Sequence, residues 1–216
     1  LMVGYDDMDS LEYMYEKRMG YWKHDGQVTI FDAFEKLRDN YLPIMNRCRA
    51  FDEMIYDDAE QAGGKKYAEI CSAAYRQVIS AHKLFTDKQG NLLFFAKENN
   101  SNGCVNTVDL TYPSAPLFLT YNPDLAKAMM TSIFEYSASG RWNKPFPAHD
   151  LGTYPIAHGQ LYGGDMPIEE GGNMVILTAA IAKIEGNADY AKKYWDLLTT
   201  WTNYLAENGQ DPENQL

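Results

Sequence analysis

The order of apolar and polar residues predicts a mainly helical chain. Apolar side chains recur at intervals of three and four over residues 67–85 and again over 190–205, where Asn208-Gly209 provides a stop. We expect each stretch to form a half-exposed helix. A further helical region should run from a cap at Thr29 to about residue 60, and Pro43 should kink or divide it near Asn40.

The segment after Pro167 has a different pattern. Residues 174–184 are almost entirely apolar, so we expect a helix that is buried on nearly all sides. The short turn 185–187 joins it to the amphipathic stretch that follows. A buried helix followed by an exposed one is typical of an inner and outer pair in a helical toroid, or of a core helix with its cover.

The middle of the chain is less regular. Residues 90–96 suit a short strand that leaves a turn, and Pro123 suits the first position of a further helix. Residues 139–167 are rich in Gly, Pro, His and Asp and carry several aromatic side chains. A loop of that length inside a compact domain is usually functional or disordered, and its aromatic residues favour function.

Composition narrows the classes of function. The 216 residues carry a formal charge of -11, with no basic stripe, so we expect no nucleic-acid partner. The longest apolar run is far too short to cross a bilayer, so we expect no membrane insertion. The three cysteines show no metal-binding spacing, and we expect Cys48 and Cys71 to be small buried hydrophobic residues.

The richest chemistry lies in the long loop and at the start of the apolar helix. Glu169 and Glu170 should lie near the positive end of that helix, with Asn173 one turn further on the same side. His149 and Asp150 add an imidazole and another carboxylate. A carboxylate near a helix start can act as a base or a nucleophile, and a second one in a less polar setting can act as an acid.

A purely structural reading of these residues stays open. The two glutamates could stabilise the helix start, and the histidine and aspartate could satisfy backbone groups of the loop. A second polar run, 97–103, with Asp109 beyond it, offers oxygen ligands for calcium. It lacks the order of a known calcium loop, so turn formation is the preferred interpretation there. Sequence signatures of serine or cysteine nucleophiles and of phosphate-binding loops are absent from the sequence.

Several long strings of residues extend over nearly the whole chain and agree in order with one family. The strings are 3–7 (VGYDD), 47–52 (RCRAFD), 73–77 (AAYRQ), 97–103 (KENNSNG), 109–117 (DLTYPSAPL), 147–155 (PAHDLGTYP) and 172–174 (GNM). Together they resemble the glutaminase A family, and they look like the central region of its Bacteroides-type members.

The resemblance implies an all-α fold that forms part of an α/α six-hairpin toroid. It implies that residues 1–216 are a fragment of one toroid domain, which lacks the N-terminal β-rich domain and the C-terminal helical portion of the full protein. It also implies a periplasmic or secreted enzyme that hydrolyses L-glutamine to L-glutamate and ammonia. The expected partners are a small-molecule substrate, glutamine or a glycan, and other domains of the same polypeptide.

Three hypotheses for function follow. The leading one is a glutaminase in which Glu169 or Glu170 activates water while His149 or Asp150 protonates the departing ammonia. The alternatives are a glycoside hydrolase of the toroid class and a non-catalytic scaffold or carbohydrate-binding module. No cofactor is indicated, and the use of a metal is left open. The candidate catalytic residues are Glu169, Glu170, His149 and Asp150, and the candidate substrate-binding residues are Asp165, Asn173, Tyr154 and Trp142.

Overall fold

The chain folds into two compact units. The computed structural model describes residues 1–98 and 100–212. The first unit comprises residues 1–8 and 19–81, and the second comprises residues 9–18 and the chain from His82 onward. The described residues are mostly helical with a few short strands, which confirms the predicted fold class.

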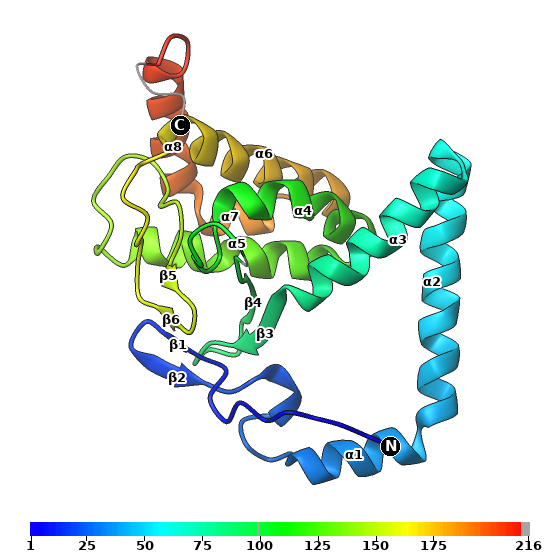
Figure 1. The fold of residues 1–216 in the computed structure, drawn as a ribbon. Helices are drawn as coiled ribbons and strands as arrows, with labels where there is room; N and C mark the ends of the chain where they lie inside the picture. Colours follow the sequence, from blue (N-terminus) through cyan, green and yellow to red (C-terminus); the bar gives the residue numbers. More distant parts are fainter. Residues whose placement is uncertain (99, 213–216) are drawn as a thin grey trace. The chain divides into compact units, whose positions relative to one another are not determined.

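Three helices make up most of the first unit (Figure 1). A short 3-10 helix, η1 (Tyr21–Lys23), precedes α1 (Ile30–Asp39), α2 (Tyr41–Gly63) and α3 (Lys65–Ser80). The predicted division near Asn40 is confirmed. Gly64 joins α2 to α3 in a hairpin with φ of 80°, a conformation that favours glycine.

The predicted cap of the first long helix is also confirmed. The Thr29 hydroxyl accepts a bond from the Asp32 backbone N–H at 3.2 Å, and the Asp32 carboxylate accepts one from the Thr29 backbone N–H at 2.8 Å. This reciprocal pair is a capping box, in which two otherwise unpaired amides of the helix start are satisfied.

Two expectations for this part of the chain are wrong. The helix predicted over 67–85 ends at Ser80, because His82–Thr86 form strand β3, paired antiparallel with β4 (Leu92–Ala96). Phe85 is fully buried in that strand, and a short apolar run cannot by itself distinguish strand from helix. Cys48 is exposed and Cys71 is only half-buried, because α2 and α3 bury few side chains, namely Ile55, Ala59 and Ala68.

The described residues of the second unit form five helices as well as the strands. The helices are α4 (Val108–Tyr121), α5 (Pro123–Ala138), α6 (Pro167–Glu185), α7 (Asp189–Lys193) and α8 (Trp195–Asn208). As predicted, Pro123 and Pro167 open helices and Asn208 ends one. The single helix expected after residue 187 is instead divided at Tyr194.

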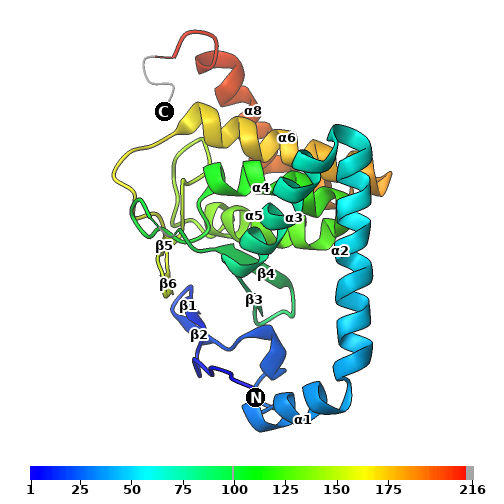
Figure 2. The same ribbon diagram turned by 45° about the vertical axis from the view of Figure 1, so that its right-hand side comes forward.

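The interior of the second unit is built on stacked aromatic rings. Helix α6 packs against α4, α5 and α8, and Figure 2 shows these helices layered together. Phe134 of α5 stacks on Tyr194 at 4.2 Å and on the fully buried Trp201 at 5.1 Å between ring centroids. This aromatic core fixes α5 against α8 and thereby supports the whole layer.

Helix α6 is less enclosed than the sequence predicts. Met174 and Ile181 are fully buried, but Ile176 and Ile184 are about half exposed. The exposed side borders an open apolar groove between α6, α7 and α8, next to Trp195. The expectation of burial on nearly all sides is therefore wrong for one edge of the helix.

A small sheet anchors the long loop of the second unit. Its strand order is β2 (Glu16–Arg18), β1 (Leu11–Tyr13), β6 (Ile156–Ala157) and β5 (Gly152–Thr153). Strand β1 pairs parallel with β6, and the Glu12 backbone N–H donates to the Pro155 carbonyl at 2.8 Å. The sheet thus joins strands β1 and β2, near the start of the chain, to strands β5 and β6 of the long loop that carries His149 and Asp150.

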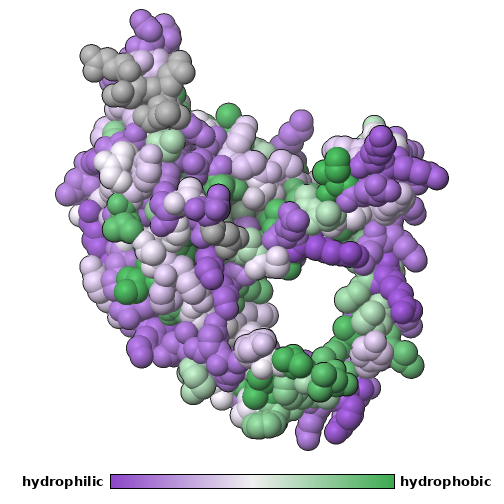
Figure 3. Space-filling model, in the orientation of Figure 1, coloured by the Kyte–Doolittle hydropathy of each residue, from purple (hydrophilic) through white to green (hydrophobic). Residues whose placement is uncertain are grey.

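Some apolar side chains of the first unit are exposed. Figure 3 shows green, apolar side chains over the N-terminal segment and α1, where Val3 and Phe31 are among the exposed residues. Among the described helices, none is long and apolar enough to cross a bilayer.

Candidate functional site

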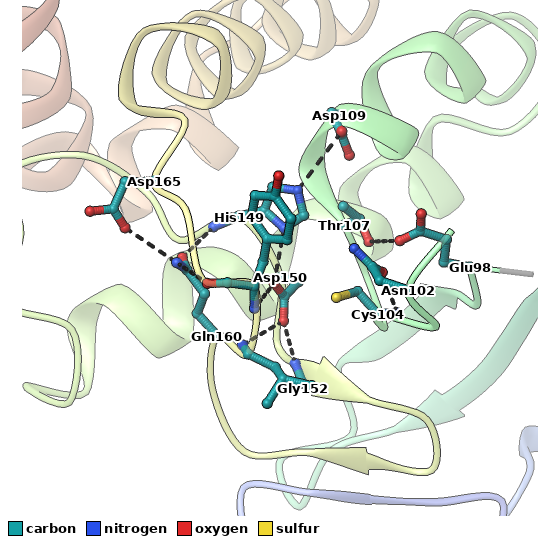
Figure 4. Close-up of polar contacts among 12 residues, drawn as sticks. Glu98, Asn102, Cys104, Thr107, Asp109, His149, Asp150, Gly152, Gln160 and Asp165 are labelled. Atoms are coloured by element: carbon teal, nitrogen blue, oxygen red, sulfur yellow. Dashed lines mark hydrogen bonds and ion pairs between the residues drawn. The ribbon is translucent and has the colours of Figure 1, made fainter. Parts of the chain in front are cut away.

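A buried aspartate organises the long loop at the candidate site. One carboxylate oxygen of Asp150 accepts bonds from the backbone N–H groups of Gly152 and Leu161 at 2.8 and 2.9 Å. The other accepts from the Tyr162 N–H at 3.1 Å and lies 2.9 Å from His149 Nδ1 (Figure 4). Four donors thus surround a carboxylate with no solvent exposure, and the loop closes around it.

These bonds determine the ionisation of Asp150. Burial by itself would raise its pKa, but the bonds from His149 and the three backbone amides outweigh burial and hold the pKa below the usual range. An ionised Asp150 requires the proton of His149 on Nδ1. The other ring nitrogen, Nε2, is then directed toward Asp109, whose carboxylate lies 3.8 Å away.

Three acid and imidazole groups meet at this point. Asp109 lies in the first turn of α4 and Glu170 in the first turn of α6, and the two helices pack against each other. One oxygen from each carboxyl and one ring nitrogen of His149 all lie within 4.8 Å of one another. We refer to Asp109, His149 and Glu170 as the acidic triad.

Glu170 is the most unusual member of the triad. Its side chain is 0% exposed, and neither of its carboxyl oxygens has a hydrogen-bond partner among the described residues. Burial, followed by the nearby carboxylates of Asp109 and Glu169, raises the pKa of Glu170 to about 10. The nearby backbone N–H of Asp109 acts in the opposite direction and lowers this pKa, although it donates no hydrogen bond to either Glu170 oxygen.

A further carboxyl lies beside the triad. Glu98 follows β4, is half-buried, and accepts a long bond from the Thr107 hydroxyl at 3.5 Å. Burial and the nearby Asp109 raise the pKa of Glu98. In the part of the chain that the structure describes, neither Glu98 nor any triad member forms an ion pair with lysine or arginine.

The structure brings only some of the predicted residues together. His149 contacts Asp150 and lies within 4.8 Å of Glu170, while Glu169 is half-buried and close enough to affect the pKa of Glu170. Asn173 is buried one turn along α6.

Other predicted residues lie in separate contacts. Asp165 is linked to the site through Gln160, whose side chain accepts from the His149 backbone N–H and donates to Asp165. Trp142 donates to a backbone carbonyl and lies under the Lys144 ammonium. Tyr154 lies under the Lys97 ammonium at 4.6 Å. The Trp142 and Tyr154 rings therefore each face a lysine of this chain.

Sequence reasoning missed part of the site. Glu98 belongs to the run considered for calcium and Asp109 lies beyond it, and nothing in the sequence connects these residues to the loop and helix 40 or more positions later. Cys104 also lies beside His149 and Asp150. Burial, followed by the charge of Asp150, raises the pKa of the Cys104 thiol to about 12, which is the wrong direction for a nucleophile.

Comparison with known families defines the class of protein. A family model described as the glutaminase A six helical-hairpin domain matches residues 64–216, and one described as a domain of unknown function (DUF5127) matches residues 1–58. Because the first covers more than half of the chain, the chain belongs to the glutaminase A family. The expectation that all 216 residues are a fragment of one toroid domain stays a prediction.

Two curated relatives are similar to the chain. Glutaminase A of Aspergillus oryzae is 37% identical over 191 residues, which is 87% of this chain and 28% of the relative. A protein of Arthroderma benhamiae named as a probable glutaminase is 34% identical over 134 residues, 61% of this chain and 15% of the relative. The chain therefore spans less than a third of either relative. No solved structure matches the chain.

Proposed function

We propose that the full-length protein hydrolyses the side-chain amide of L-glutamine to L-glutamate and ammonia, and that the acidic triad is its reactive centre. The names of the two relatives support the reaction. The observation that carries the placement is Glu170, a fully buried carboxyl without a partner next to Asp109 and His149. Polar groups that are buried at a cost without a structural bond mark functional sites.

The geometry also favours particular roles. Asp150 is a positioning residue, because all its bonds serve the loop and the His149 ring. Asp150 acts neither as a proton donor nor as a base, because its pKa is held low and both of its oxygens already accept hydrogen bonds. The half-buried carboxyls of Glu98 and Glu169 border the triad, and we assign to them the exchange of protons with water and with the departing ammonia.

The carboxyl spacing does not favour the glycosidase alternative. Paired carboxyls in glycoside hydrolases are separated by roughly 5 to 9.5 Å, depending on mechanism. One oxygen of Asp109 and one of Glu170 lie within 4.8 Å of each other, so this pair does not have the wide spacing, roughly 6.5 to 9.5 Å, that leaves room for a water in inverting enzymes. A glycan panel assayed beside glutamine tests this alternative, and turnover of a glycan without turnover of glutamine would replace our proposal.

The direct test is ammonia release from L-glutamine by the full-length protein. We expect Glu170→Gln to lower kcat/KM by about 10²- to 10⁴-fold. The matched control is Glu185→Gln, the same change at the other end of α6, where the half-buried side chain pairs with Lys127. Near-normal turnover is expected for that control. Unchanged turnover in Glu170→Gln would exclude the triad as the reactive centre.

Export to the periplasm or the medium stays a prediction, as do the likeness to Bacteroides-type members and the association with other domains of the polypeptide.

A further inference from the structure

We propose that the acidic triad binds a divalent transition-metal ion through Asp109, His149 and Glu170. The assignment of that ion to water activation rests on the proposed glutaminase function, but the binding itself does not. The three ligand atoms come from α4, the long loop and α6 and lie within 4.8 Å of one another. Oxygen and imidazole ligands from separate elements, brought to one point, are the usual composition of such a site.

The first argument is the unsatisfied state of the carboxyls. Both oxygens of Glu170 and one of Asp109 are buried without a hydrogen-bond partner among the described residues. A buried polar atom without a partner costs on the order of 1 to 3 kcal/mol, and more if it is charged. A cation placed between the two carboxyls and His149 Nε2 would satisfy these oxygens together.

The second argument is the support of the histidine. A metal-binding imidazole usually donates its other N–H to a carboxylate, which fixes the tautomer and the direction of the ring. His149 Nδ1 lies 2.9 Å from Asp150, a carboxylate that is itself held by three backbone amides. Tyr162 stacks on the imidazole at 4.4 Å between centroids, so the ring is fixed on a second side.

The third argument is charge. Four carboxyls, those of Glu98, Asp109, Asp150 and Glu170, surround one imidazole. Within the described part of the chain, no lysine or arginine pairs with any of them, and the nearby Lys97 ammonium lies over the Tyr154 ring instead. A bound dication would offset the charge of the ionised carboxylates and would compensate for the burial of the Glu170 carboxyl.

The ligand types indicate which ions fit. Carboxylate oxygens alone would suit calcium or magnesium, whereas an imidazole shifts the preference toward zinc, manganese and related ions. The other possible cluster, Cys104 with His149 and Asp150, is weaker because both Asp150 oxygens already accept backbone bonds. Cys104 is therefore excluded from our ligand set, which makes it a useful control.

The chemistry balances with water as the only co-reactant. The ion would supply Lewis-acid activation of water, and a neighbouring carboxylate would take a proton from that water as its oxygen adds to the side-chain amide carbon of glutamine. The bond from that carbon to nitrogen breaks, the nitrogen takes the proton, and glutamate and ammonia leave. The bordering carboxyls of Glu98 and Glu169 supply the proton relay, as proposed above.

Metal binding is tested on the full-length protein without reference to activity. The protein is treated with a chelator, dialysed, and titrated with Zn²⁺, Mn²⁺ and Ca²⁺ separately, with bound metal measured by mass spectrometry and the melting temperature followed. We expect one equivalent of Zn²⁺ or Mn²⁺, a higher melting temperature, and little response to Ca²⁺. A wild-type protein that takes up no ion would overturn the proposal.

The variants separate ligands from neighbours. Glu170→Gln should abolish stoichiometric binding, and Asp150→Asn should weaken it by about 10- to 100-fold. Cys104→Ser and Glu185→Gln should bind as the wild type does, and far-ultraviolet circular dichroism in chelator checks that every variant is folded. If Glu170→Gln binds as tightly as the wild type, or if Cys104→Ser loses the ion, our ligand set is wrong.

The outcomes also distinguish this proposal from the proposed function. Stoichiometric binding that depends on Glu170, without glutamine turnover, would support the metal site and refute the glutaminase assignment. Glutamine turnover that survives complete metal removal would support the glutaminase assignment and refute the role of the ion.

Discussion

Two glutamates of the second unit lie in opposite settings. Glu135 of α5 accepts a hydrogen bond from the Tyr13 hydroxyl at 2.8 Å, and Lys193 is close enough to favour its charged form. Glu170 of α6 is more deeply buried, has no donor among the described residues, and faces other carboxyls. Burial raises the pKa of both side chains.

The difference separates a structural carboxyl from a functional candidate. Around Glu135 the fold supplies a donor and a cation, so the burial of the carboxyl is partly compensated. Around Glu170 the fold supplies further acidic side chains, which increase the free-energy cost of burying its carboxyl group. A side chain kept in such a setting needs a reason outside the packing of the fold, and a ligand or a reacting group is the simplest reason.

The largest expected effect is on activity. Glu170→Gln should reduce glutamine turnover by about 10²- to 10⁴-fold, whereas Glu135→Gln should leave it within about twofold of the wild type. Steady-state ammonia release by the two full-length variants makes the comparison. Equal losses in both would erase the distinction between the two carboxyls.

The next effect concerns the residue that positions His149. Asp150→Asn keeps the size of the side chain but replaces one acceptor oxygen with a donor, so the imidazole loses its fixed tautomer. We expect activity to fall by about 10- to 100-fold. Because three backbone amides also bond to Asp150, melting temperature must be measured beside turnover. A loss of stability without a loss of activity in the folded fraction would make Asp150 a loop anchor only.

The fold and half of the site could be predicted from the sequence. The helix starts at Pro123 and Pro167 and the cap at Thr29 are local signals, and the structure bears them out. His149, Asp150 and Glu170 could be chosen because they lie close together in an unusual loop and helix start.

The rest depended on contacts that the sequence does not display. Helix α4 contains Pro113 and Pro116, which normally argue against a helix interior, so its first-turn Asp109 could not be placed. Only the packing of α4 on α6 brings Asp109 to Glu170. Strand β4 lies within the predicted strand segment 90–96, but its partner β3 was missed, because the apolar residues after Ser80 fit a continued helix as well as a strand.

A smaller effect is expected when the donor of Glu135 is removed. Tyr13→Phe leaves that carboxyl without its hydroxyl partner and so makes it resemble Glu170. We expect the free energy of unfolding to fall by about 1 to 3 kcal/mol at neutral pH. Denaturant unfolding of the full-length protein measures this, with Tyr15→Phe, an exposed tyrosine, as the control. An unchanged stability would mean that the bond to Glu135 contributes nothing net.

The smallest effect is the stabilisation expected when the charge of Glu135 is removed. The folded pKa of Glu135 is raised, chiefly by burial, so the fold favours the protonated form and loses stability as pH rises from the unfolded pKa through the folded one. Glu135→Gln stays neutral and can still accept the Tyr13 bond. It should therefore be more stable than the wild type at neutral pH and nearly equal to it below pH of about 4. Melting temperatures measured across that range decide the matter. A variant that is less stable at neutral pH would show that Lys193 and Tyr13 favour the charged form more strongly than burial opposes it, and the contrast with Glu170 would then be larger than described above.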